Sequence, residues 1–149
     1  MQHFSQFEPK ITDKNGRKQI FDVIRKKNVK LTPEELVRQF FIDFLINKMN
    51  YPAGLIAVEK PVMINGMRQR ADILLYNRSG EPVMIIECKA PNVKIGQETI
   101  DQAARYNLSL GVKYLSITNG KTTYCVKLDL VGEKHQALSE FPGVGEVVN

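Results

Sequence analysis

The stretch Arg70-Ala-Asp-Ile-Leu-Leu-Tyr-Asn-Arg-Ser-Gly-Glu-Pro-Val-Met-Ile-Ile-Glu-Cys-Lys89 decides the fold of this chain. Two runs with strand character, residues 70–76 and 83–89, flank a link that is rich in strand-breaking residues. We therefore expect two strands that pair as neighbours in a hairpin. Residues 83–86 are apolar at every position, which is typical of a central strand that is covered on both faces.

Charged side chains gather at one end of this predicted strand pair. Residues two apart in a strand project to the same face, so Glu87 and Lys89 point together while Cys88 points the opposite way. One pairing register brings Asp72 of the first strand into the same group. The same alternation places Asp72 on the face opposite to that of three of its neighbours, Ala71, Ile73 and Leu75.

This group has the composition of a metal-dependent nuclease site. Ionised groups at the end of a buried strand are unfavourable unless they are paired or bind a metal. Two carboxylates suit Mg²⁺, for which Mn²⁺ can substitute, because Mg²⁺ takes few carboxylates and keeps several waters. A lysine beside them could activate an attacking water or stabilise charge on a phosphate. The alternative is a structural ion pair at the edge of the sheet.

Length and composition indicate one globular domain that is not a membrane protein. The chain has 149 residues, of which 43% are apolar and 25% are charged, as in ordinary soluble proteins. It contains no run of about 18 apolar residues and no secretory leader, so we expect a cytoplasmic protein. Its two cysteines, Cys88 and Cys125, lie in apolar strand patterns and are predicted to be buried free thiols.

The positive charge is concentrated near the N-terminus. The net charge is +5, and residues 10–30 hold eight basic against two acidic side chains. We treat residues 1–19 as a basic lead-in arm, ahead of a domain at 20–128 and a tail at 129–149. Such an arm suits a polyanionic partner such as DNA, because basic side chains bind phosphates without regard to sequence. The alternative is a solvated segment without a partner.

A helix is predicted from Pro33 to about Met49. Thr32 has the character of an N-cap, Pro33 occupies the first helical position, and Glu35 completes a capping box. Glu34 flanks the apolar stripe of this helix and could reach a site at the edge of the sheet. The alternative is that both glutamates only cap the helix.

The remaining patterns complete a mixed sheet. Residues 55–64 and 112–128 predict further strands, with hairpin signals at Asn65-Gly66 and Asn119-Gly120. Between them, residues 98–110 predict a helix whose crossover would make strand 112–118 parallel to the strand of Glu87.

Gln102 and Tyr106 are four residues apart on this second helix and therefore share a face. The Gln102 amide could hydrogen-bond a ligand or a phosphate-bound water. The alternative is an ordinary packed helix.

In combination, these residues resemble a known superfamily. The order Arg70-x-Asp72, Glu87-x-Lys89 and Gln102-x-x-x-Tyr106 is similar to that of PD-(D/E)XK nucleases. Four segments resemble more closely the N-terminal nuclease domain of type I restriction enzyme R subunits: Leu31-Thr-Pro-Glu-Glu-Leu-Val-Arg-Gln39, Arg70-Ala-Asp-Ile-Leu-Leu-Tyr76, Ile85-Ile-Glu-Cys-Lys-Ala-Pro91 and Ile117-Thr-Asn-Gly120. The resemblance implies an α/β fold of the restriction-endonuclease type, in which helices flank a mixed central sheet.

The resemblance also implies roles for individual residues. Asp72 and Glu87 would bind Mg²⁺ together with the backbone carbonyl of Cys88, and Lys89 would position or activate the hydrolytic water. Gln102 would face the site, and the acidic position on the first helix would fall to Glu34 or Glu35. The implied function is that of a Mg²⁺-dependent DNA endonuclease domain.

Two departures limit what the resemblance implies. Ala71 stands where the superfamily has proline, a residue that shapes the backbone and supplies no ligand. These residues contain no Gly-x-x-x-x-Gly-Lys-Ser/Thr phosphate loop, so they cannot form the ATP-driven motor of a type I R subunit. Expected partners are DNA and motor, specificity or methylase subunits, with a homodimer if both DNA strands are cut. The alternative is a catalytically idle nucleic-acid-binding or scaffold domain.

Overall fold

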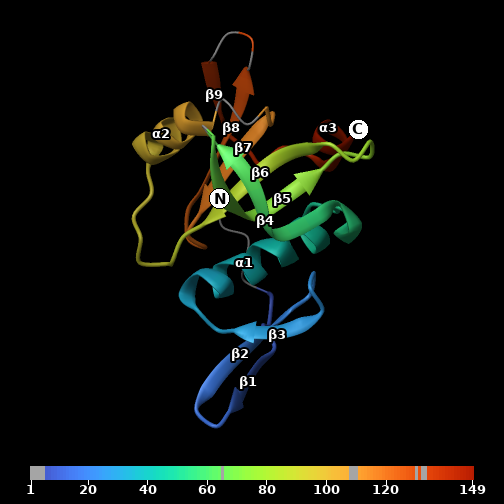
Figure 1. The fold of residues 1–149 in the computed structure, drawn as a ribbon, viewed down its shortest axis with the longest axis vertical. Helices are drawn as coiled ribbons and strands as arrows, with labels where there is room; N and C mark the ends of the chain where they lie inside the picture. The colour runs from blue at the N-terminus through green and yellow to red at the C-terminus, as the bar shows by residue number, and fades with distance from the viewer. Residues whose placement is uncertain (1–5, 65, 108–110, 130, 132–133) are drawn as a thin grey trace.

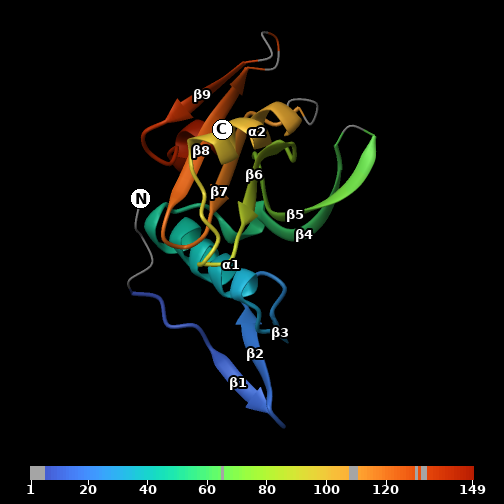
Figure 2. The ribbon, with the colours of Figure 1, turned by 90° about the vertical axis from the view of Figure 1, so that its left-hand side faces the viewer.

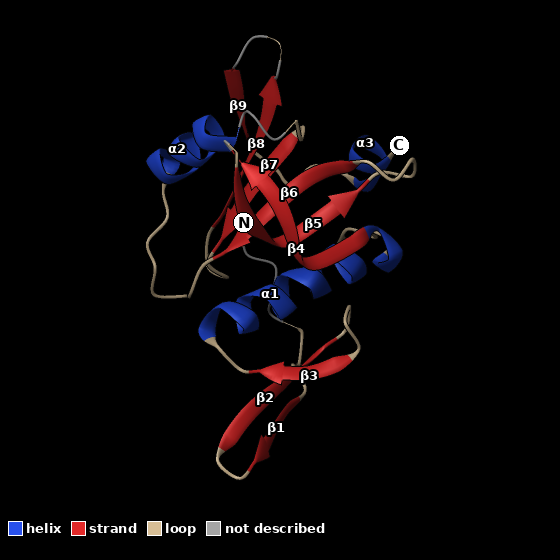
Figure 3. Ribbon diagram, viewed as in Figure 1, coloured by secondary structure: helices blue, strands red, loops and turns tan. Residues whose placement is uncertain are grey.

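The computed structural model describes residues 6–64, 66–107, 111–129, 131 and 134–149. Within this part of the chain, strands and helices form a mixed α/β fold with two sheets (Figures 1 and 3). None of the helices described is long and apolar enough to cross a membrane.

The larger sheet holds the stretch from Arg70 to Lys89 at its centre. Its strand order follows the sequence: β4 (Ile56–Ile64), β5 (Met67–Tyr76), β6 (Pro82–Cys88), β7 (Tyr114–Thr118), β8 (Thr123–Asp129) and β9 (Lys134–Leu138). The first three strands are consecutive and antiparallel, as predicted, and β7 is parallel to β6. The helix between β6 and β7 makes the crossover that a parallel pair requires.

Helices cover this sheet on both faces. The first is α1 (Pro33–Asp43), which continues into a π-helical turn at Phe44–Lys48, so the predicted helix to about Met49 is confirmed. The side-chain oxygen of Thr32 accepts a hydrogen bond from the Glu35 N–H at 3.0 Å, which is the predicted N-cap. On the other face lies α2 (Gln97–Asn107), and a short α3 (Val144–Val148) packs near the C-terminus (Figure 1).

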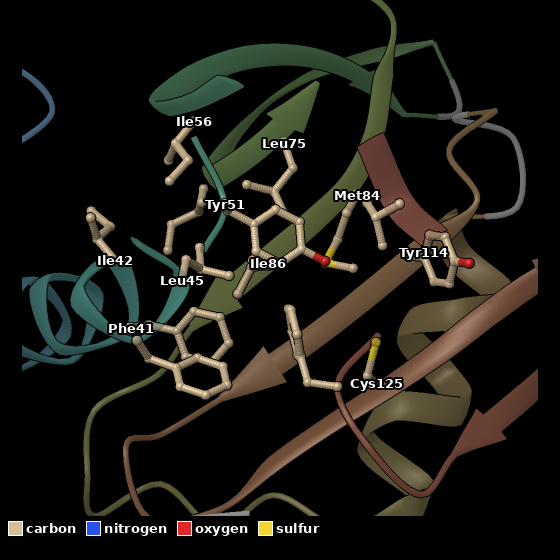
Figure 4. Close-up of a cluster of buried hydrophobic side chains, with 14 of the residues drawn as sticks. Phe41, Ile42, Leu45, Tyr51, Ile56, Leu75, Met84, Ile86, Tyr114 and Cys125 are labelled. Atoms are coloured by element: carbon tan, nitrogen blue, oxygen red, sulfur yellow. The ribbon is translucent and has the colours of Figure 1, made fainter. Parts of the chain in front are cut away.

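Two buried clusters of apolar side chains follow from this arrangement. The first lies between α1, α3 and one face of the sheet, and Figure 4 shows Phe41, Tyr51 and Ile86 within it. The second lies beneath α2 and contains Leu74, Ile85 and Ile100. Both cysteines are buried and free, as predicted.

The smaller sheet has three antiparallel strands, β1 (Ile11–Lys14), β2 (Arg17–Asp22) and β3 (Lys27–Lys30). It lies across α1 from the larger sheet (Figures 1 and 2). The sequence analysis treats residues 1–19 as a basic lead-in arm ahead of the domain. The observed β2 runs across the predicted division between residues 19 and 20.

Two further expectations differ from the structure. The predicted tail after residue 128 supplies β9 to the sheet and Phe141 to the first core cluster. Ala71, predicted to share a face with Ile73, packs instead with the cluster of Leu74. The pairing of β4 with β5 is interrupted at Glu59, whose φ is +56°. The hairpin bends at this point (Figure 2), and the side chains there depart from the alternation of a regular strand.

Candidate active site

The ladder between β5 and β6 ends where the two predicted acids begin. Its last pair is Ile73 with Ile86, so Asp72 and Glu87 are the next residues on the two strands. An oxygen of the Asp72 carboxylate, Oδ2, accepts a hydrogen bond from the Cys88 N–H at 2.8 Å. The carboxylate therefore satisfies a backbone N–H at the end of the ladder, and this hydrogen bond holds it against β6.

Asp72, Glu87 and Lys89 line a common pocket of about 300 Å³. The structure therefore brings together the three charged residues that strand alternation grouped. The pocket lies on the α2 side of the sheet, since Ile85 of the second core cluster lines it too. The other lining residues are Val62, Gln69, Arg70, Ala71 and Asn107.

The two carboxylates are not fully compensated by neighbouring cations. Burial raises the pKa of Asp72, with a smaller contribution from the negative charge of Glu59, and these outweigh the lowering effects of the Cys88 N–H, Arg38 and Lys89. Burial also raises the pKa of Glu87, and the negative charge of Asp72 raises it further, against the lowering effect of Lys89. The ammonium Nζ of Lys89 lies 3.8 Å from Glu87 Oε2 and is partly exposed. A divalent cation would relieve this imbalance more effectively than a single exposed lysine.

The donor set fits a hard cation with few protein ligands. Among the described residues, no group of three or more His, Cys, Asp or Glu side chains is arranged to hold a metal. Two carboxylates facing one pocket, with water in the other positions, match the way proteins bind Mg²⁺. They do not match a structural zinc site, which needs four protein ligands of the His or Cys type.

Cys88 presents only its backbone to this site. Its side chain is 5% exposed and packs in the first core cluster, on the face of the sheet away from the pocket. Burial raises the pKa of the Cys88 thiol well above its usual value, so the thiol stays protonated. A role for the Cys88 carbonyl as a metal ligand stays a prediction.

The glutamates of the first helix lie apart from the pocket. Glu34 is exposed, and neither Glu34 nor Glu35 is among the described residues that line the pocket. Glu35 is buried, with its carboxylate 3.0 Å from both Arg25 Nη2 and Arg38 Nε. A metal-binding role for Glu34 stays a prediction.

Arg38 and Glu59 connect this helix to the site and were missed by sequence reasoning. Arg38 Nη1 donates a hydrogen bond to the backbone carbonyl of Asp72 at 3.2 Å, and its Nη2 lies 2.6 Å from Glu59 Oε1. Glu59 is also paired with Arg70. Arg38 was visible in the sequence as a charged residue beside the apolar stripe of its helix, but nothing in the local pattern named its partners.

On α2, the pocket is lined by Asn107 and not by Gln102. Gln102 is exposed, and the side chain of Tyr106 lies outside the described residues. Asn107 is 1% exposed, and its Nδ2 donates to the Ala103 carbonyl at 2.6 Å. Its Oδ1 is buried and has no hydrogen-bond partner in the described part of the chain. An unpaired buried acceptor is unusual and suits a water or a bound ligand.

The comparisons with known proteins agree with this fold. No curated protein matches the chain by sequence. Among solved structures, it resembles a fragment structure assigned to an HsdR subunit of a type I restriction enzyme from Vibrio vulnificus YJ016, with a TM-score of 0.53 and 24% identity. The similarity covers 78% of this chain but only 24% of that one, so this chain spans about a quarter of the length of its structural relative.

The family comparison covers most of the sequence. Residues 33–142 match the family described as type I restriction enzyme R protein N terminus (HSDR_N). This range begins with α1, includes all six strands of the larger sheet and contains the pocket between β5 and β6. The chain therefore belongs to the family of type I restriction enzyme R protein N-terminal domains.

Proposed function

We propose that this domain is a Mg²⁺-dependent DNA endonuclease of the PD-(D/E)XK type, which hydrolyses phosphodiester bonds within a type I restriction system. One observation carries the proposal: Asp72 and Glu87 follow directly on the last pair of the β5–β6 ladder and face one pocket with Lys89. The raised pKa values of both carboxylates support it, because burial disfavours their ionised forms and a bound cation would offset that effect.

Each residue of the candidate site has its own role in the proposed reaction. Asp72 and Glu87 would hold Mg²⁺, with the Cys88 carbonyl as a backbone ligand. The bound ion would polarise the scissile phosphate and offset the carboxylate charges. Lys89 would hold the attacking water and stabilise the charge that develops on the phosphate as the new P–O bond forms and the ester bond breaks.

Other residues have supporting roles in this proposal. Arg38 fixes the backbone of Asp72 through its hydrogen bond to the carbonyl, and thereby holds one ligand in place. Ala71 is buried beside the site and supplies no ligand, so the loss of the superfamily proline leaves the donor set intact. Gln102, exposed on α2, would act only once DNA lies across the pocket.

Membership of the family supports the proposed substrate and partners. DNA is the proposed substrate, and the motor, specificity and methylase subunits of a restriction system are the proposed protein partners. A homodimer would supply the two sites that a double-strand break requires. Translocation would depend on a motor outside these residues, which contain no phosphate loop.

Plasmid cleavage tests the proposal. We expect the purified chain to nick or linearise supercoiled DNA with Mg²⁺ or Mn²⁺, and to lose this activity in EDTA. Lys89→Ala should reduce the rate by about a hundredfold or more, since a positioned proton-transfer or charge-stabilising group contributes that much. Lys127→Ala removes an exposed lysine that pairs with Tyr114, at the end of β7 away from Lys89, and should cleave at the wild-type rate.

The competing possibility is an idle DNA-binding or scaffold domain. It predicts no cleavage under any of these conditions, or residual cleavage that survives both EDTA and Lys89→Ala because it comes from a contaminant. Either result would overturn the nuclease assignment.

A further inference from the structure

The smaller sheet has two unlike faces, and the strand register shows which residues lie on each. Residues that pair directly across antiparallel strands project to the same side. Gln19 pairs with Thr12 on one side and with Lys30 on the other, and Arg17, two residues earlier in β2, pairs with Lys14. These five residues therefore share one face, which we call the outer face.

The outer face is strongly basic. Lys14, Arg17 and Lys30 are all exposed on it. Lys10 joins them, because its ammonium Nζ lies 5.9 Å from the centre of the Phe21 ring and Phe21 projects to the same side as Gln19. Within the three strands, no acidic side chain shares this face. The face therefore presents four cations with no acidic neighbour in the sheet.

The opposite face carries the acids and is directed towards the body of the domain. Ile20 and Asp22 are fully buried there, and Asp13 and Lys27 share this side through their pairing with Lys18 and Asp22. Burial alone would raise the pKa of Asp22, but its hydrogen bonds with Arg25 and Ile24 lower the pKa overall. The separation of charge between the two faces follows from alternation along the strands and not from net composition.

The outer face is also hollowed. A cavity of about 590 Å³ is lined by Arg17, Gln19 and Lys30, together with Gly16, Lys18 and Leu31. Cations placed around an open hollow can contact several phosphates of one backbone at the same time. The Phe21 ring is half-buried and has Lys10 over it, so it is not available as a stacking platform for an unpaired base.

A series of ion pairs connects this sheet to the candidate active site. Arg25 pairs with Asp22 of β2 and with Glu35 of α1. Glu35 pairs with Arg38, which donates to the backbone of Asp72. The sheet is therefore anchored to the same helix that supports the pocket (Figure 1).

We propose that the outer face binds the sugar-phosphate backbone of duplex DNA without sequence preference. The four cations supply the affinity through counterion release, and the hollow accommodates the backbone. The inference rests on the proposed function in taking DNA as the substrate, but it concerns binding and is tested without cleavage.

Two double variants that remove the same net charge test this proposal. Arg17→Gln/Lys30→Gln removes the two outer-face cations that line the hollow. Lys26→Gln/Lys27→Gln neutralises one lysine of the opposite face and one in the turn beside it, both exposed. Binding of a short fluorescent duplex is followed by anisotropy in EDTA over a range of salt concentrations. Circular dichroism and thermal unfolding establish that each variant is folded.

We expect the outer-face variant to bind the duplex about tenfold or more weakly, and its salt dependence, as the slope of log K against log salt concentration, to fall by about two. The matched variant should keep the wild-type slope. Equal losses in both variants would overturn the proposal, because affinity would then follow net charge alone. Tighter binding of a single strand that is lost in the outer-face variant would overturn the duplex assignment.

The outcome is separable from that of the nuclease assignment. If the chain binds duplex through the outer face but never cuts it, the binding proposal stands and the nuclease assignment falls. If cleavage depends on Lys89 and the outer-face variant binds like its matched control, only the binding proposal falls.

Discussion

Two groups of carboxylates lie close together in this domain, and the pKa values of the two groups are shifted in opposite directions. Asp22 and Glu59 are paired with guanidinium groups, and although burial alone would raise their pKa values, Arg25 and Arg38 lower them overall. Asp72 and Glu87 face a pocket with Lys89 and with Arg70, which is paired with Glu59, and burial raises the pKa values of both carboxylates. Arg38 contacts both groups, since it pairs with Glu59 and donates to the Asp72 backbone.

The comparison separates the paired acids from the acids that we propose to bind a metal. Paired carboxylates stabilise the fold when ionised, so their cations are part of the structure. Carboxylates without adequate counterions destabilise the fold when ionised, and are retained where a bound cation repays that cost. Comparing the number of cations with the number of carboxylates in each group therefore distinguishes the ion-pair network from the candidate metal site more clearly than residue type does.

Breaking the paired group should produce the largest effect. Arg38→Met leaves Glu35 and Glu59 each with one fewer guanidinium partner and removes a donor from the Asp72 carbonyl. We expect the free energy of unfolding to fall by about 3 kcal/mol, as is typical when one member of a buried ion pair is removed. Urea denaturation would measure this change.

The matched control removes the other guanidinium that contacts Glu59. Arg70 is 74% exposed on its side chain, so Arg70→Met should change stability by less than about 1 kcal/mol. Equal losses of stability in the two variants would show that burial of the ion-pair network contributes nothing to the free energy of unfolding.

Neutralising a carboxylate of the pocket should have the opposite effect and raise the free energy of unfolding. Asp72→Asn keeps an oxygen that can accept the Cys88 N–H but removes the charge. Because the folded pKa of Asp72 is raised, its ionisation weakens the fold as pH rises from about 4, the unfolded value, through the folded pKa. At neutral pH and without metal, we expect the variant to be more stable by about 1 kcal/mol.

Thermal unfolding in EDTA at pH 4 and pH 7 measures this difference. The gain should be larger at pH 7 than at pH 4, because the raised pKa of Asp72 makes its ionisation, and the loss of stability that follows, increase as pH rises. Asp13→Asn serves as control, because Asp13 is exposed and its oxygen also accepts a backbone N–H. A loss of stability in Asp72→Asn at pH 7 would place Asp72 with the structural acids.

Replacing Asn107 should give the smallest effect on the fold. Asn107→Leu is close in volume and removes a buried acceptor that has no partner among the described residues. It also removes the bond from Nδ2 to Ala103, so we expect stability to change by less than about 1 kcal/mol. If the oxygen serves a water or substrate in the pocket, DNA cleavage should fall while stability is kept. Unchanged cleavage would make Asn107 a packing residue only.

Much of the larger sheet could be predicted because its signals are local. Alternation along residues 70–89, the hairpin signals and the Thr32 cap each depend on neighbouring residues, and all three agree with the structure except for the alternation at Ala71. Predicting that Asp72, Glu87 and Lys89 lie together required only the two-residue alternation of a strand and one pairing register of the two strands. The metal and catalytic roles that were assigned to these residues remain predictions.

The rest depends on contacts between distant segments. Glu59 adopts a left-handed backbone and pairs with Arg38 of another element, and no sequence pattern specifies either feature. Asn107 enters the pocket because α2 packs across β7, β8 and β9, so its position depends on how the helix lies on the sheet and not on its spacing from Gln102. The smaller sheet was missed because its strands are mostly exposed and lack an apolar alternation.

Calorimetric titration of the metal-free chain with Mn²⁺ tests the central claim most directly. The account predicts saturable binding of Mn²⁺ to the wild type that is lost in both Asp72→Asn and Glu87→Gln and retained in Asp13→Asn. Binding that persists unchanged in the two pocket variants, or no binding to the wild type, would contradict the claim that these carboxylates share one divalent ion.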